Sequence, residues 1–334
     1  MTRPGGRCVT LVDYVTPLHP LPVLSDELGI DLSIKRDDLA GAPFGGNKSR
    51  QLEHYLGAAL REQADTILIT GAVQSNFART AAAAARSLGM EAIVQLEDRV
   101  PGMDDIYRSS GNVLLLRILG VEVMHHPDGE DEAGADAALR RRAEMLRIEG
   151  KRPYVIPLAP DNPPLGALGY VQAGQEIVSQ AADFDFVVVP SGSGLTHAGL
   201  LSGLRRAGSN ARVIGSCVRR AGAPQFDRML QVLNGLSLLL NTVSVAEKSD
   251  IHLWDGALAP GYGRIGAPAA DAMRMMARRE GIMLDPVYSA KAFAAIPALA
   301  GTGLFVHTGG LAATFGYQAM LEKTFKTEST QDYD

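Results

Sequence analysis

Short runs of Val, Ile and Leu that alternate with helix-like segments are the feature that most constrains the fold of this chain. Strands buried on both faces of a parallel sheet appear in a sequence as continuous apolar runs, and the helices between them make the crossover connections. We therefore expect an α/β fold with mostly parallel sheets covered by helices on both faces. The expected strands are residues 32–35, 66–70, 92–96, 121–124, 152–157, 184–189, 212–215 and 304–306.

Helical spacing of apolar residues, or a run rich in alanine, marks the segments between these strands. Residues 221–265 are harder to assign, because the apolar run 236–240 fits either a strand or a helix. The other expected helices are residues 78–88, 112–119, a charged segment that ends near 148, and 165–180.

Composition excludes several classes of function. The 334 residues are enough for two domains, and a net charge of −5 argues against nucleic-acid binding, which needs a basic face. The sequence has no run that reads as a membrane span or a signal peptide. Cys8 and Cys217 have neither metal-site nor redox spacing, so we expect no metal site and a location in the reducing cytoplasm.

A glycine pair and a lysine mark the start of one expected helix. In Gly45-Gly46-Asn47-Lys48 the glycines permit a sharp turn and a close approach to a ligand, and Asn47 is a favoured N-cap residue. Lys48 then lies in the first turn, where the helix macrodipole disfavours a cation and lowers the pKa of the amine. This placement suits a reactive lysine, although a solvated surface lysine is an equally ordinary interpretation of these residues alone.

The segment 190–197 follows an apolar strand and opens a helix. Its small residues expose successive N–H groups, and the helix N-terminus adds positive potential, so the segment is typical of a phosphate-binding cup. A dinucleotide fingerprint does not fit, because His197 stands where its third glycine is required. A P-loop is excluded because no Gly-Lys-Ser/Thr follows. The remaining alternatives are a cup for a phosphate monoester and a tight structural turn.

Residues 71–77 repeat this pattern of strand, glycine turn and helix start. A helix N-terminus suits a small carboxylate, and Ser75 and Asn76 can form hydrogen bonds to it. Simple N-capping explains one polar residue here, but less easily the three consecutive ones, Gln74, Ser75 and Asn76. Two further polar clusters, 285–289 and 307–310, lie where ligands bind in open α/β sheets if they follow parallel strands.

A reactive amine, a phosphate cup and an anion-binding turn are together what pyridoxal phosphate requires. With these residues in place, the chain resembles the fold-type II pyridoxal-phosphate enzymes, which are similar to the tryptophan synthase β chain. Within them it resembles the 1-aminocyclopropane-1-carboxylate deaminase/D-cysteine desulfhydrase family over nearly its whole length. The motifs, in family order, are Lys35-Arg36-Asp37-Asp38, Gly45-Gly46-Asn47-Lys48, Gln74-Ser75-Asn76, Ser191-Gly192-Ser193-Gly194, Gly261-Tyr262-Gly263, Asp285-Pro286-Val287-Tyr288 and His307-Thr308-Gly309-Gly310.

The resemblance implies a particular division into domains. A large cofactor-binding domain would comprise residues 1–50 and 158–334, and a smaller α/β domain, residues 51–157, would be inserted between them. This replaces the division into N-terminal and C-terminal halves that the order of elements alone suggests. The resemblance also implies a homodimer.

The resemblance implies a role for each candidate residue. Lys48 would carry the cofactor and act as general base, Asn76 would contact the 3-hydroxyl of the cofactor, and Thr308 would contact its ring nitrogen. The residues implied for its phosphate are Gly192, Ser193, Gly194, Leu195 and Thr196. Those implied at the substrate are Ser75, Asn76, Phe77, Tyr262 and Tyr288. The candidates for catalysis are Lys48, Ser75, Tyr262 and Tyr288.

Two positions separate the activities within the resembled family. The ring-opening deaminases are similar in having Glu after Pro-Val-Tyr and Leu before the last Gly-Gly, whereas this chain has Ser289 and Thr308. A threonine hydroxyl can only hydrogen-bond a neutral ring nitrogen, which suffices for β-elimination. Leu195 departs from the family pattern, where a third glycine is usual, and so does Ser289-Ala290.

We therefore expect a pyridoxal-phosphate lyase that carries out α,β-elimination on a small β-substituted amino acid. D-Cysteine, which gives pyruvate, ammonia and hydrogen sulfide, is the leading candidate. The alternatives are a cysteate sulfo-lyase or a related β-elimination, 1-aminocyclopropane-1-carboxylate deamination, and a non-catalytic protein that only binds the cofactor.

Overall fold

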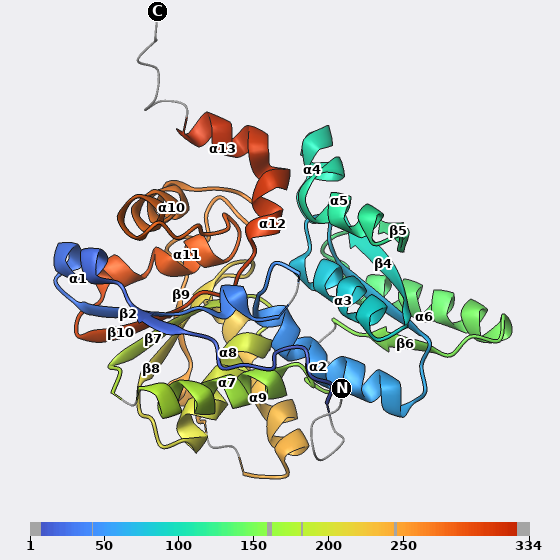
Figure 1. Cartoon of the computed structure of the whole chain (residues 1–334), viewed down its shortest axis with the longest axis horizontal. Helices are drawn as coiled ribbons and strands as arrows, with labels where there is room; N and C mark the ends of the chain where they lie inside the picture. Colours follow the sequence, from blue (N-terminus) through green and yellow to red (C-terminus); the bar gives the residue numbers. More distant parts are fainter. Residues whose placement is uncertain (1–7, 42, 159–161, 182, 244–245, 326–334) are drawn as a thin grey trace, which may run out of the picture.

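The computed structural model describes residues 8–41, 43–158, 162–181, 183–243 and 246–325. Its larger sheet has six strands in the order β1-β2-β10-β7-β8-β9 (Figure 1). Only the β1–β2 pair is antiparallel. The strands are β1 (Leu18–Pro20), β2 (Asp31–Lys35), β7 (Phe186–Ser191), β8 (Arg212–Cys217), β9 (His252–Trp254) and β10 (Thr302–Val306).

The smaller sheet has four strands in the order β5-β4-β3-β6, all parallel. They are β3 (Thr66–Ala72), β4 (Glu91–Glu97), β5 (Glu122–His126) and β6 (Pro153–Ile156). The predicted α/β fold with mostly parallel sheets is thus confirmed. Each sheet buries its apolar strands against a different set of helices, and the strands therefore form two separate sheets.

Helices cover both faces of both sheets (Figure 1). Four 3₁₀ turns complete the description, at Asp37–Leu39, Lys248–Asp250, Ile296–Ala298 and Phe315–Tyr317. The helices are α1 (Pro22–Leu28), α2 (Asn47–Arg61), α3 (Asn76–Ser87), α4 (Asp105–Ser109), α5 (Gly111–Ile118), α6 (Glu132–Ile148), α7 (Ala167–Gln180), α8 (Leu195–Arg206), α9 (Gly222–Leu240), α10 (Ala267–Glu280), α11 (Ser289–Phe293), α12 (Leu311–Thr314) and α13 (Gln318–Phe325).

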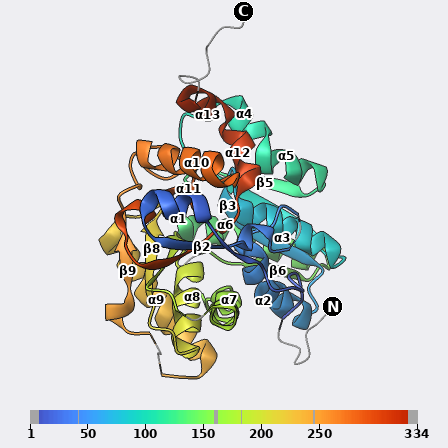
Figure 2. The ribbon, with the colours of Figure 1, turned by 60° about the vertical axis from the view of Figure 1, so that its left-hand side comes forward.

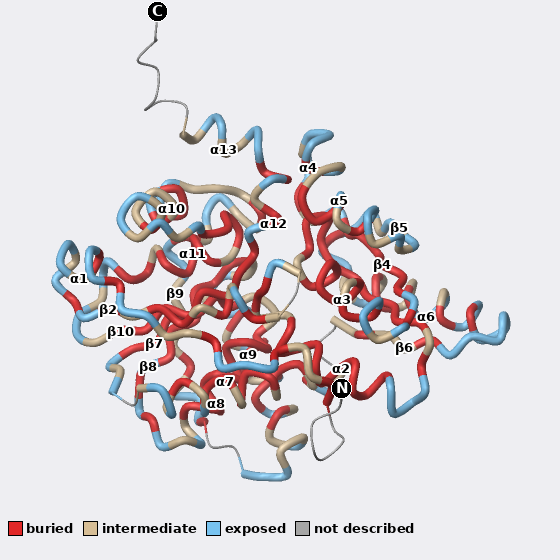
Figure 3. The backbone as a smooth tube through the Cα atoms, in the orientation of Figure 1, coloured by how far each residue is buried: buried red, intermediate tan, exposed pale blue. Residues whose placement is uncertain are grey.

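Strand β7 shows why the large sheet needs two helical layers. Val187 and Val189 face a core shared with α7, α8 and α9, whereas Phe186 and Val188 face a core shared with α1, α10 and α11. Successive strand residues point to opposite faces, so an unbroken apolar run must be covered on both. Figure 3 shows the resulting buried centre beneath exposed outer helices.

The segment that the sequence left open is a helix. Residues 236–240 form the last turn and a half of α9, with Leu236 buried and Leu238 83% exposed. The alternation of burial along this run follows a helix, because only one side of it meets the core. At the other end of the chain, α12 and α13 return to lie beside α4 and α5 (Figures 1 and 2).

We propose that residues 1–50 and 158–334 form the large domain and residues 51–157 the small one. The two sheets support this division, since each draws all its strands from one of the two sets. Helix α2 crosses the boundary. Among the described residues, no helix is both long and apolar enough to cross a bilayer.

A buried ion network holds the start of α2 against the large sheet. Asp37 is fully buried and accepts hydrogen bonds from Arg50 at 2.9 and 3.0 Å and from Tyr170 at 2.6 Å. Glu176 on α7 pairs with both Arg50 and Lys35. Burial alone would raise the pKa of Asp37, but the charge of Arg50 and the hydrogen bonds from Arg50, Tyr170 and Thr16 together outweigh it, and the pKa lies below its ordinary value. The network therefore fixes the direction in which α2 leaves the sheet.

Asp37→Ala should lower the free energy of unfolding by about 3–5 kcal/mol, because it leaves the Arg50 guanidinium buried without this partner. The measurement is denaturant unfolding followed by circular dichroism. Glu144→Ala is the matched control, since the Glu144–Arg147 pair is 66% and 53% exposed, and it should cost less than about 1 kcal/mol. Equal losses in the two variants would show that the buried network is not structurally important.

Candidate active site

A cavity opens where the carboxyl ends of strands from both sheets meet. Parallel strands gather ligand sites at this edge, and the turns that follow β3, β7 and β8 all line the cavity. The predicted residues that line it are Lys48, Ser75, Asn76, Phe77, Gly192, Ser193, Gly194, Leu195, Thr196, Tyr262, Tyr288 and Thr308. The structure thus brings together every residue to which the resemblance assigns a role at the cofactor or the substrate.

Lys48 lies in the first turn of α2, with its Nζ 3.4 Å from Gln51 Oε1 and 5.4 Å from the centre of the Phe77 ring. Burial lowers the pKa of Lys48 to about 8. The helix macrodipole predicts a lowered pKa for this amine, and in the structure the cause of the lowering is desolvation. Lys48 is half-buried and lines the cavity, so the interpretation as a solvated surface lysine is wrong.

The turn that places Lys48 depends on Gly45. Its φ is +59°, and a Cβ at this position would lie 1.6 Å from the carbonyl oxygen of Asp38. Only glycine accommodates both this backbone conformation and this close approach. The turn brings the Asn47 N–H to the Thr308 carbonyl at 3.1 Å, so Lys48 and Thr308 enter the same cavity.

Asn47 does not cap α2, in contrast to the prediction. The N-cap position is Gly46, which lacks a side chain, and Asn47 is the first helical residue. Asn47 Nδ2 and Gln51 Nε2 instead both donate to Thr196 Oγ1, each at 2.8 Å. The reason lies in the tertiary structure. The Thr196 hydroxyl on α8 accepts a hydrogen bond from the Asn47 side chain, so this side chain does not bond to the first turn of its own helix. These bonds connect the lysine-bearing helix to the predicted phosphate cup.

The cup lies between β7 and α8. Gly194 has φ of +88° and precedes the first residue of α8, Leu195, so the free N–H groups of the first helical turn face the cavity edge. Leu195 is buried and packs with Met229 and Val232. The leucine that departs from the family pattern therefore serves the core, while its backbone remains in the cup.

Ser75 both caps α3 and lines the cavity. Its Oγ accepts from the Ala78 N–H at 3.1 Å, which confirms the simple capping interpretation for this residue. Asn76 Oδ1 accepts from Asn112 Nδ2 at 2.9 Å, and this bond orients the Asn76 side chain. Gln74, the third polar residue of the run, turns away and donates to the carbonyls of Tyr107 and Ser110.

Tyr262 and Tyr288 lie side by side in the cavity wall. Their hydroxyl oxygens are 2.6 Å apart and their rings pack edge to face. Burial raises the pKa of Tyr288 well above its ordinary value, so this hydroxyl stays protonated at neutral pH. Lys291 Nζ donates to the carbonyls of Leu258 and Gly261 at 3.0 and 2.7 Å, which fixes the loop that carries Tyr262.

The two positions that separate lyases from deaminases are placed differently. Thr308 lines the cavity. The Ser289 side chain instead bonds to Asp285 at 2.6 Å, is fully buried and is not a lining residue. The expectation that both positions bear on the site therefore holds only for Thr308, since the Asp285 carboxylate organises the turn around Ser289.

Charged residues that the sequence analysis did not select complete the wall. They are Arg99, Glu132, Arg219, Arg220 and Arg228. Glu132, the first residue of α6, accepts from three of these arginines at 2.5–3.2 Å. The run Arg219-Arg220, one residue after the end of β8, could have indicated an anion site, but Arg99 and Glu132 stand in no recognisable motif.

Comparisons with known proteins agree with this geometry. Residues 9–309 match the family model "Pyridoxal-phosphate dependent enzyme". The chain is 41% identical over 322 residues to a D-cysteine desulfhydrase of Klebsiella pneumoniae, covering 93% of this chain and 96% of that protein. It is 39% identical over 318 residues to a D-cysteine desulfhydrase of Salmonella choleraesuis, covering 92% and 95%.

Solved structures show the same fold. An ACC deaminase homologue superposes with a TM-score of 0.85 at 37% identity, covering 96% of both chains. An O-ureido-L-serine synthase superposes with a TM-score of 0.65 at 20% identity, covering 92% of this chain and 93% of that one. At that identity the second likeness concerns the fold alone.

The lowered pKa of Lys48 predicts its reactivity. In the cofactor-free folded protein, acetylation of Lys48 by a small reagent should reach half its maximal rate near pH 8, since only the neutral amine reacts. In the urea-unfolded protein the midpoint should move to about 10.4, the ordinary value for lysine. Peptide mass spectrometry measures both profiles, and the same midpoint in the two states would contradict the assignment.

Proposed function

Because this chain belongs to the family of pyridoxal-phosphate dependent enzymes, we propose that it is a lyase acting on a small β-substituted amino acid by α,β-elimination. D-Cysteine, converted with water to pyruvate, ammonia and hydrogen sulfide, is the leading substrate. The observation that carries the proposal is the meeting of Lys48, the cup at residues 192–196 and Ser75 in one cavity.

The residues present fit pyridoxal phosphate. An amine in the cavity wall with a pKa of about 8 suits attachment of an aldehyde, and the free N–H groups of α8 suit a phosphate monoester. A Cβ on Gly192 would come within 3.1 Å of Val218 Cγ2, so a larger residue would crowd the wall of the cup. When bound, pyridoxal phosphate supplies an electron sink for negative charge at the substrate Cα.

We propose that three residues hold the cofactor beside the cup. Lys48 would bind its aldehyde carbon, Asn76 its 3-hydroxyl and Thr308 its ring nitrogen. The orientation of Asn76 by Asn112 supports the second role. A threonine at the third position donates a hydrogen bond and supplies no charge, which favours β-elimination over ring opening.

The remaining side chains act on the substrate. We propose that Ser75, Asn76 and Phe77, at the N-terminus of α3, bind its carboxylate, because a helix N-terminus stabilises an anion. Lys48 removes the proton from Cα, since an amine with a pKa of about 8 is a suitable base near neutral pH. The Tyr262–Tyr288 pair then holds a proton ready for the departing β-substituent.

The test is the release of pyruvate and of the leaving group from a panel of D- and L-amino acids that bear thiol, sulfonate or chloride at Cβ, with 1-aminocyclopropane-1-carboxylate included. D-Cysteine should give pyruvate and sulfide in equal amounts. Cysteate would give sulfite, and the cyclopropane substrate would give 2-oxobutanoate, so each rival reaction has its own product. Binding of the cofactor without any turnover on this panel would refute the proposal.

We further propose that the protein acts as a homodimer in the cytoplasm. The resemblance to the family supports the dimer. The buried free thiols of Cys8 and Cys217 are compatible with a reducing compartment. Gel filtration with light scattering measures the oligomeric state.

Ser75→Ala should raise the KM for the amino acid about 10-fold or more with a smaller change in kcat, because a hydrogen bond to a charged carboxylate contributes roughly 1.5–3 kcal/mol. It should also cost about 1 kcal/mol of stability, because α3 loses its cap.

Asp104→Ala is the matched control, because Asp104 is an exposed residue that caps α4 through the Tyr107 N–H at 2.8 Å. It should cost similar stability and leave the KM unchanged. If both variants change the KM alike, Ser75 is only a cap.

A further inference from the structure

Arg99 lies in the cavity wall beside the two tyrosines. It follows β4, lines the same cavity as Ser75 and Lys48, and its side chain is 9% exposed. The residue after Arg99, Val100, packs against Gly263, next to Tyr262, and the charge of Arg99 acts on the hydroxyl of Tyr288. The two tyrosine hydroxyls are the groups proposed to meet the β-substituent of the substrate, so Arg99 stands at that end of the site.

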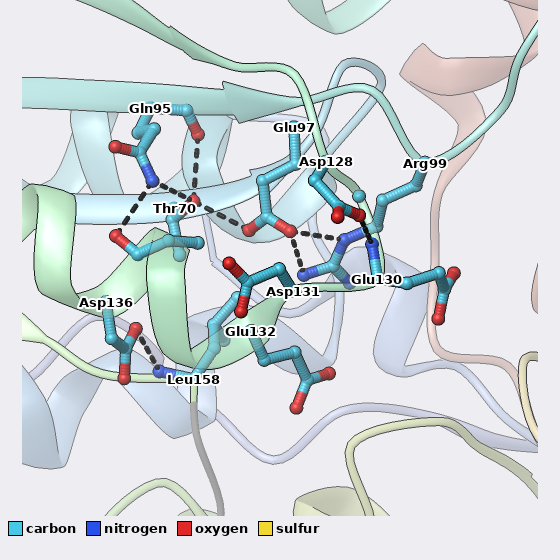
Figure 4. A network of polar contacts seen from close by, with 12 residues as sticks. Thr70, Gln95, Glu97, Arg99, Asp128, Glu130, Asp131, Glu132, Asp136 and Leu158 are labelled. Carbon is cyan, nitrogen blue, oxygen red and sulfur yellow. Dashed lines mark hydrogen bonds and ion pairs between the residues drawn. The ribbon is translucent and has the colours of Figure 1, made fainter.

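A dedicated framework holds Arg99 in place (Figure 4). Its Nε donates to Glu97 Oε2 at 2.8 Å, and Nη2 lies 2.7 Å from the same oxygen. The other oxygen of Glu97 accepts from Thr70 Oγ1 at 2.6 Å, and Gln95 Nε2 donates to Thr70 Oγ1 at 3.2 Å. Glu97 and Gln95 are almost completely buried. Three side chains from two strands therefore orient one guanidinium.

The charge of Arg99 persists in this setting. Burial opposes it, but the Glu97 carboxylate favours the charged form, and the pKa of Arg99 lies above its ordinary value. Glu97 contacts only one edge of the guanidinium, through Nε and Nη2. Among the described residues, no hydrogen bond engages Nη1, which leaves a charged donor for a ligand.

The other arginines of the wall, Arg219, Arg220 and Arg228, all bond to groups of the protein. Arg219 donates to Glu132 and to the carbonyl of Gly129. Arg228 donates to the carbonyls of Ser193 and Leu158 as well as to Glu132. Arg220 donates to Glu132 and to the carbonyl of Gly192. These bonds brace the outside of the phosphate cup, so the charge of these residues is directed to the cofactor end of the cavity.

We propose that Arg99 binds an anionic β-substituent and makes the site selective for amino acids with a second negative group at Cβ, such as a sulfonate, sulfinate or thiolate. This inference rests on the proposed function and names its substrate class. A planar guanidinium held by Glu97 presents fixed donors to such a group. A neutral substituent would accept a weaker hydrogen bond from this charged donor than an anion does, which disfavours its binding.

Aspartate and asparagine test this selectivity, because they differ only in the charge of the β-substituent and have no leaving group. Each chirality would be measured as a competitive inhibitor of pyruvate release from β-chloroalanine by the holoenzyme. For the chirality that binds better, aspartate should bind at least about 10-fold more tightly than asparagine, the ratio expected of a charge-assisted hydrogen bond. Aspartate that binds no better, or fails to bind, overturns the proposal.

Arg99→Gln should reduce the aspartate preference to less than about 3-fold. Because this variant leaves Glu97 as a buried unpaired carboxylate, the double variant Glu97→Gln/Arg99→Gln removes both charges and guards against misfolding. It should lose the preference equally. A preference that survives in either folded variant overturns the proposal.

Arg108→Gln is the matched control, since Arg108 is 42% exposed and pairs with Asp98 at the surface. It should keep the preference of the parent. Turnover of β-chloroalanine separates the two proposals, because its substituent is neutral. Failure to release pyruvate from any β-substituted amino acid defeats the proposed elimination, whereas pyruvate release without an aspartate preference defeats only the role of Arg99.

Discussion

The close backbone contact around Gly45 is the constraint on which the rest of the site depends. The turn leaves no space for a side chain against Asp38, and it presses the start of α2 onto the Thr308 carbonyl. Lys48 therefore enters the cavity from a fixed direction. The buried Asp37–Arg50 ion pair stabilises this contact, because Arg50 lies in the same first turn of α2 as Lys48. The same contacts at the start of α2 therefore stabilise the fold and place the amine of Lys48.

Electrostatics divides the cavity into regions with different tasks. Desolvation without a nearby carboxylate lowers the pKa of Lys48 to about 8 and makes it a base. The N-termini of α3 and α8 offer N–H groups to anions without adding a titrating group. Arg99 keeps its charge because it pairs with Glu97, and its pKa lies above the ordinary value. In one cavity, burial thus lowers the pKa of Lys48, whereas pairing with Glu97 keeps Arg99 charged.

Polar residues behind the cavity wall hold the residues of the site in position through hydrogen bonds. Thr196 accepts from both Asn47 and Gln51 and so couples the phosphate cup to the lysine helix. Glu97 couples the guanidinium of Arg99 to the β3 strand through Thr70. Each link joins elements that are distant in the sequence. Such links hold the donors at fixed separations, which is what binding a small ligand with three charged or polar groups requires.

The sequence by itself determined the parallel strands, through their apolar runs, and the cavity residues that stand in local motifs, such as Lys48, Ser75 and the cup at 192–196. Periodicity and glycine turns are local properties, so they can be read without a fold. Tertiary structure alone decided that Asn47 bonds to Thr196 and does not cap its helix, and that Arg99 lines the cavity. These outcomes depend on partners from other elements and on burial, neither of which leaves a pattern in the neighbouring residues.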